Sequence, residues 1–219
     1  AANASAGASP SRRPRAKPAA LPSIGVKWRG DSTQMSWEGK PSWSIGFRRG
    51  EACDTLGGME RITLDAMTDD DAQGRLVIEA LLLERLGRTV PRAAYAALTV
   101  DGEPFGLYAI VEYVDEHFVS NHLGSWAGVV WTGGAGADFT SAGLAAWDDV
   151  NGVGDEARLV AVADVVQGAG ETFYADLGAV LDTTDFAAHW AALAAVGDQG
   201  TYPYETDDAN LLVPDVGLI

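Results

Sequence analysis

The stretch VDGEPFGLYAIVEYVD fills residues 100–115 and is the part of the chain that decides the fold. Two apolar runs flank the Asp-Gly pair at 101–102. An Asp-Gly pair between hydrophobic runs is a strong local signal for a β-hairpin, because these residues tolerate the positive φ angles of a tight turn. The pattern predicts a hairpin over residues 95–114, with carboxylates at Glu112 and Asp115 near the end of its second strand.

The residues before the hairpin carry strand signals and one helical signal. Trp43, Ile45 and Phe47 alternate with small residues, which is typical of a half-buried strand. Residues 72–86 have apolar side chains at helical spacing around most of the circumference, which predicts a well-buried helix. We expect residues 24–114 to form a mainly antiparallel sheet packed on this helix.

The later part of the chain reads as mainly helical. Amphipathic helices are predicted over residues 155–167 and 183–196, the second with Asp182 as its N-cap, and a short strand over 211–213. Strands first and helices afterwards favour an α+β protein with two lobes.

Composition divides the chain into three segments. Residues 1–22 are rich in Ala, Ser and Pro, which favours a disordered linker. We assign residues 23–132 to a sheet-rich lobe and residues 133–219 to a helical lobe.

Charge and residue counts exclude several classes of protein. The 219 residues carry a formal net charge of −16; the first fifty hold nine basic and two acidic residues, so the remainder carries −23. The acidic bulk argues against nucleic-acid binding, which needs a basic surface. No apolar run approaches the ~18 residues that indicate a membrane span. Cys53 is the only cysteine, which excludes an internal disulfide and a cysteine metal cluster.

The sequences of several segments resemble motifs of the CotH kinase family, whose members are atypical, bacterial-type protein kinases first known from spore coats. The hairpin is similar to the family's "NGe-x-x-GlY-x-x-vE-x-vD" signature. Four further segments are similar to family motifs in the same order between residues 26 and 118: VKWRGDST at 26–33, KPSWSIGF at 40–47, Asp70, Asp71 and Arg75 ahead of the apolar helix, and GRTVPR at 87–92.

The resemblance implies a fold and a reaction. The fold is an atypical two-lobed protein-kinase-like fold, with a nucleotide-binding antiparallel sheet lobe followed by a mainly helical lobe. The reaction is transfer of phosphate from ATP, with Mg²⁺, to Ser or Thr of a protein partner. Family resemblance also implies a secreted, cell-surface or spore-coat location, while the substrate and the compartment stay open.

A later segment resembles the family's catalytic loop, "g-n-x-D … N-y-y-l-y". On this alignment Asp198 is the base that orients the acceptor hydroxyl, and Asn210 is a metal ligand. Eleven residues separate the two positions, a longer insert than the family usually has, so Asp207 and Asp208 are alternatives to Asp198. Without the resemblance Asp198 reads as an ordinary loop residue.

The family alignment also points to residues that would bind the nucleotide. The cations are Arg29, Lys40 and Arg75, with Glu112 as a carboxylate beside the phosphates. Each has a structural alternative. Lys40 also reads as a solvated strand-edge lysine, and Arg75 as the partner of a nearby acid. For Glu112 we weigh a pair with Lys40 equally against a salt bridge to Arg75 or Arg92, because a carboxylate in an apolar strand needs a partner.

Three departures from the family pattern bear on whether the chain is an active kinase. Gly46 and Thr132 stand where members often have lysine, and the sequence ends before the "p-W-D-l-D" segment that carries a second metal-binding aspartate. The sequence is either a C-terminally truncated piece of a longer protein, which the apolar Leu218 and Ile219 at its end favour, or a natural form that lacks one magnesium ligand; in both cases we expect the chain as given to transfer phosphate poorly. The alternative function is a non-catalytic surface or spore-coat-type binding module on a degenerate kinase fold.

Overall fold

The chain has an α+β fold in the computed structural model, which describes residues 24–29, 39–47, 55–68, 70–124, 129–134, 136–150, 156–168, 170–197 and 210–213. The strands are β1 Gly25–Arg29, β2 Ser42–Gly46, β3 Arg61–Asp65, β4 Ala93–Val100, β5 Glu103–Glu112, β6 Val129–Gly133, β7 Trp147–Asp149 and β8 Asn210–Val213. The helices are α1 Arg75–Arg85, α2 Glu116–Leu123, α3 Glu156–Gln167, α4 Phe173–Val180 and α5 Thr183–Val196, with a 3₁₀ turn at Gly143–Ala146.

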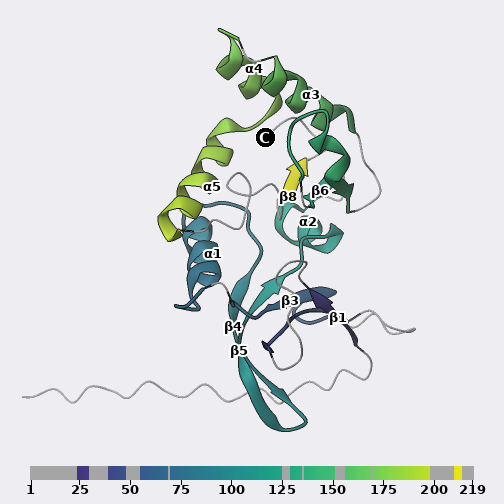
Figure 1. Ribbon diagram of the computed structural model, residues 1–219, viewed down its shortest axis with the longest axis vertical. Coiled ribbons are helices and arrows are strands. Elements are labelled where there is room, and N and C mark those ends of the chain that lie inside the picture. The colour runs from purple at the N-terminus through teal and green to yellow at the C-terminus, as the bar shows by residue number, and fades with distance from the viewer. Residues whose placement is uncertain are drawn as a thin grey trace, which may run out of the picture.

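The first five strands form one antiparallel sheet in the order β1-β2-β3-β5-β4. The predicted hairpin is confirmed as β4 and β5, joined at Asp101 and Gly102, which both have positive φ. The hairpin extends beyond the rest of the sheet (Figure 1). The predicted antiparallel sheet over residues 24–114 is therefore confirmed.

The register of the sheet defines two faces. Trp43 pairs with Leu64 and Leu64 with Ile110, and this row lies in a buried cluster that also contains Tyr108. Side chains alternate along a strand, so Ala109 points to the other face, where it packs with Val77 of α1. We call these faces the Tyr108 side and the α1 side.

Helix α1 differs from its prediction at its start and in its burial. It begins at Arg75 rather than at residue 72, because the Asp70 carboxylate accepts hydrogen bonds from the backbone N–H groups of Ala72, Gly74 and Arg75 and holds the preceding residues in a turn. Val77 and Leu83 are its buried residues. The prediction of a well-buried helix is wrong, since two of its apolar side chains are about half exposed: Ile78 (55%) and Leu81 (49%).

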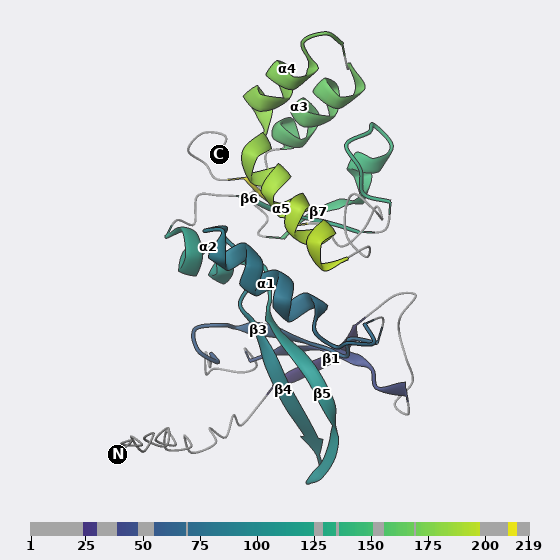
Figure 2. The same ribbon diagram turned by 90° about the vertical axis from the view of Figure 1, so that its left-hand side faces the viewer.

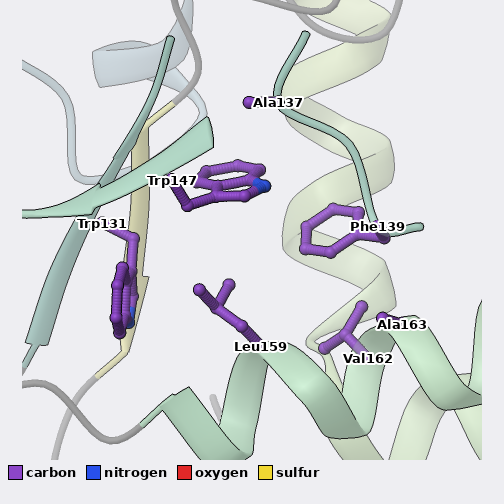
Figure 3. Close-up of a cluster of buried hydrophobic side chains, with 7 residues drawn as sticks. All are labelled: Trp131, Ala137, Phe139, Trp147, Leu159, Val162 and Ala163. Carbon is purple, nitrogen blue, oxygen red and sulfur yellow. The ribbon is translucent and has the colours of Figure 1, made fainter. Parts of the chain in front are cut away.

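The later part of the chain forms a second antiparallel sheet with three helices. The strand order is β7-β6-β8, which confirms the predicted strand near residue 211. Its core is a cluster in which the two sheet tryptophans face α3 (Figure 3): Trp131, Ala137, Phe139, Trp147, Leu159, Val162 and Ala163. The helix α4 was not predicted.

Helix α5 joins the two parts, because it packs against α1 (Figure 2). Its predicted N-cap is confirmed: the Asp182 carboxylate accepts bonds from the N–H groups of Thr184 and Asp185. Just beyond the end of α1, Arg88 pairs with Asp185 in the first turn of α5 at 2.5 Å. The helices therefore run antiparallel, and the end of α5 at Val196 lies toward the start of α1.

Among the described residues, no helix is both long and apolar enough to cross a membrane.

Candidate nucleotide site

The two ends of the five-stranded sheet carry different sets of charged residues. At one end β1 finishes at Arg29, which pairs with Ser42 at the start of β2, and β3 finishes at Asp65. At the other end β5 finishes at Glu112, which pairs with Ile62. We call these the Arg29 end and the Glu112 end.

Arg29 and Arg75 lie on the same side of the sheet. The row that contains Arg29 and Ser42 is next to the Trp28–Trp43 row and therefore faces the opposite way, toward α1. Arg75 is the first residue of α1 and follows β3 through a short connection. Because α5 runs antiparallel to α1, its C-cap Gly197 also lies toward this end of α1. The described chain thus brings two of the three predicted cations to the side on which α5 packs.

Lys40 belongs to the same end of the sheet but to the opposite side. Its ammonium donates a hydrogen bond to the carbonyl of Ala66 at 2.7 Å and lies 5.0 Å from the centroid of the Tyr108 ring. The Lys40 backbone has a φ of 59°, an uncommon conformation for a residue with a side chain. Burial lowers the pKa of Lys40, and the carboxylate of Asp65 partly opposes this effect.

Glu112 stands apart from these cations. Its side chain is 2% exposed, and both oxygens are bonded by the Arg92 side chain, to Nη2 at 2.8 Å and to Nε at 3.0 Å. His122 of α2 adds a contact at 2.8 Å. Of the two alternatives for Glu112, the salt bridge to Arg75 or Arg92 is the one that forms, and its partner is Arg92. The pair with Lys40 is not formed, since Lys40 lies beside Gly106 and Tyr108, at least four residues along β5, or about 13 Å.

The environment of Glu112 stabilises its charged form. Burial acts to raise the pKa of Glu112, but the hydrogen bonds from Arg92 and His122 outweigh it, and the pKa lies below its ordinary value of 4.5. His122 also packs on Phe118 with ring centroids 4.4 Å apart. The spacing of the histidines gave no signal for this contact, because it depends on where α2 docks.

The predicted catalytic pair is described only in part. Asp198 lies outside the described residues, as do its alternatives Asp207 and Asp208. Asn210 opens β8, where its backbone pairs with Thr132 of β6. Their roles stay predictions.

A bound Mg²⁺ would need oxygen ligands. Within the described ranges, no group of three His, Cys, Asp or Glu side chains is arranged to hold a metal ion. Magnesium is commonly held by one or two carboxylates together with substrate phosphates, so a site need not be a protein cage. The amide oxygen of an asparagine such as Asn210 is a ligand that Mg²⁺ accepts. A magnesium site there would also need a carboxylate ligand, for which Asp198 is the candidate.

Comparison with known protein families matches residues 26–208 to the CotH kinase protein family. The match covers most of the 219 residues, and the chain belongs to the CotH kinase family. It includes the five helices and all of the strands except β8, which begins at Asn210 just beyond the match, and the first residue of β1. A search of curated proteins finds no match to the chain.

Proposed function

We propose that this protein is an ATP-dependent protein kinase that transfers phosphate to Ser or Thr of a protein partner. The family match over residues 26–208 carries the proposal at the level of a kinase. A two-lobed arrangement, with the nucleotide between the five-stranded sheet and the later helices, is part of the proposal. The contact between α1 and α5 supports it, because this contact brings the later helices to the α1 side.

We assign the phosphate-binding cations to the α1 side. Arg29 and Arg75 would offset the negative charge of the triphosphate, which is the main task of a protein in phosphoryl transfer. Bound Mg²⁺ would neutralise charge on the phosphate oxygens, and Asn210 would contribute to holding it. Asp198 follows directly after Gly197, the C-cap of α5, and would accept a hydrogen bond from the acceptor hydroxyl.

Radiolabel transfer tests this assignment. The chain extended by a segment with a second metal-binding aspartate is incubated with Mg²⁺, γ-labelled ATP and a degenerate Ser/Thr peptide library, because we expect the chain as given to transfer phosphate poorly. We expect Asp198→Ala to abolish transfer while nucleotide affinity, measured by calorimetry, changes little, since this acid orients the acceptor. Asp207→Ala and Asp208→Ala are the controls for the alignment. Loss of transfer in one of these variants and full activity in Asp198→Ala would show that the base is assigned wrongly.

A non-catalytic binding module is the second candidate function. The observation that favours it is that the Lys40 ammonium already bonds to Ala66, while Gly46 stands where the family often has another lysine. The same calorimetry separates the two functions. A chain that binds no MgATP, alone or when extended by a segment carrying a second metal-binding aspartate, would support the binding module.

A further inference from the structure

Ala66 is held from both sides by side chains from the start of β2. The Lys40 ammonium donates to its carbonyl at 2.7 Å, and its N–H donates to Oγ of Ser42 at 2.9 Å. Ala66 is 1% exposed, so its backbone groups need such partners. Together the side chain of Lys40, two residues before β2, and that of Ser42, the first residue of β2, tie the residue after β3 to the start of β2. We call this arrangement the Ala66 clamp.

The hairpin fixes the lysine that closes the clamp. A Cβ atom added at Gly106 would lie 3.2 Å from Cε of Lys40, so glycine leaves the space that the lysine stem fills. The Tyr108 ring lies beneath the ammonium, and its hydroxyl donates to the carbonyl of Pro41 at 3.1 Å. Gly106 and Tyr108 therefore hold both the side chain of Lys40 and the backbone that follows it.

The clamp connects the two arginines of the proposed site. Ser42 pairs with Arg29 across β1 and β2, so the strand that carries one half of the clamp also sets the position of Arg29. Ala66 begins the connection that leads from β3 to Arg75 at the start of α1. A displacement of Ala66 would change the position of each arginine relative to the other.

We propose that Lys40 is a positioning residue: together with Ser42, Gly106 and Tyr108 it holds Ala66 and so sets the spacing of Arg29 and Arg75, and its ammonium does not contact the nucleotide. This inference rests on the proposed function for its effect on MgATP binding. The clamp itself is a property of the fold and is testable without a nucleotide.

A double-mutant cycle on stability tests the clamp. Gly106→Ala alone strains the backbone, which has a φ of +155°, and brings the added Cβ to 3.2 Å from Cε of Lys40, so that the lysine stem must shift by a few tenths of an ångström. In a Lys40→Ala background this tight contact is gone. We therefore expect Gly106→Ala to change the unfolding constant at least about fivefold less in that background, as for residues in contact. Gly102→Ala is the matched control, because Gly102 has a φ of +88° and no atom near the added Cβ. Equal coupling at Gly102, or none at Gly106, would overturn the clamp.

Calorimetry with MgATP tests the positioning role. Ser42→Ala removes the uncharged half of the clamp, and Lys40→Ala removes the charged half. We expect both to weaken MgATP binding by a similar factor, about three- to tenfold, the loss typical of one hydrogen bond. A direct phosphate contact would instead make the effect of Lys40→Ala far larger than that of Ser42→Ala and strongly dependent on salt.

Chemical labelling distinguishes the two roles, because MgATP would slow the acetylation of a lysine that binds phosphate. Lys40 acetylation by acetic anhydride is followed by mass spectrometry with and without saturating MgATP. We expect its rate to stay within about twofold, since the ammonium is held by Ala66 and Tyr108, away from the nucleotide. Strong protection by MgATP would overturn the inference. If wild type binds no MgATP, the proposed function fails, and the stability cycle still decides the clamp.

Discussion

The Tyr108 side and the α1 side of the same sheet use their charged residues differently. On the Tyr108 side, Lys40 and Glu112 are both turned inward, the first to a backbone carbonyl and the second to Arg92 and His122. On the α1 side, Arg29 ends the edge strand β1 and Arg75 begins α1, the helix on which α5 packs. All four residues came from one family alignment. The comparison teaches that a family motif names the residue types but not the face of the sheet on which each residue lies, and the face decides which partners a charge can reach.

The largest expected effect is at Glu112, on the Tyr108 side. We expect Glu112→Ala to lower the free energy of unfolding by about 2–3 kcal/mol, because it removes the charge-assisted hydrogen bonds from Arg92 and His122, while the half-exposed Arg92 side chain left behind can be solvated by water. Glu103→Ala is the matched control, since Glu103 is an exposed glutamate on the same strand and should cost less than about 0.5 kcal/mol. Urea unfolding measures both. Equal losses would remove the distinction between the two carboxylates.

The pH dependence of stability sharpens the same point. The folded-state pKa of Glu112 is depressed, so its stabilising contribution is fully present above its ordinary value of 4.5 and is lost as the pH falls through the folded pKa. Glu112→Gln lacks this contribution. We expect the stability gap between wild type and Glu112→Gln to narrow as the pH falls below about 5. A gap that widens on acidification would mean that the carboxyl is held in its neutral form.

A smaller effect is expected at the helix caps of the two parts. The Asp115 carboxylate caps α2, and that of Asp182 caps α5, each by accepting two backbone hydrogen bonds. Replacing either by Ala should cost about 1 kcal/mol in urea unfolding. Asp115→Ala should also couple to His122→Ala, because both substitutions release α2 from Glu112. The stability losses of Asp182→Ala and His122→Ala should be additive, because the two residues belong to different helices. A coupling energy as large as that between Asp115→Ala and His122→Ala would show that the effect is not specific to α2.

The sequence predicted those parts of the fold that depend on neighbouring residues. The Asp-Gly turn and the cap at Asp182 both act within a few residues. The exposure of Ile78 was missed because it depends on where α5 docks, a contact between distant parts of the chain.

The candidate site was predictable in its residue types and not in its geometry. The partner of Lys40 is Ala66, which lies 26 residues away, and no local pattern specifies it. Gly106 did carry a usable signal. A glycine inside a strand pattern indicates a bulge or a close approach, and both occur here: the β4–β5 register shifts beside it, and the Lys40 stem fills its space.

The most direct test of whether the nucleotide binds on the α1 side at the Arg29 end compares two substitutions of arginines in α1. The quantity measured is the affinity for MgATP. Arg75 and Arg85 are the first and last residues of the same helix, about 15 Å apart, so they differ mainly in which end of the sheet they approach. Calorimetry should show that Arg75→Gln weakens MgATP binding about tenfold or more, the loss expected for a charged phosphate contact. Arg85→Gln should leave the affinity within about twofold. Equal effects of the two substitutions, or a larger effect at Arg85, would contradict the placement of the nucleotide.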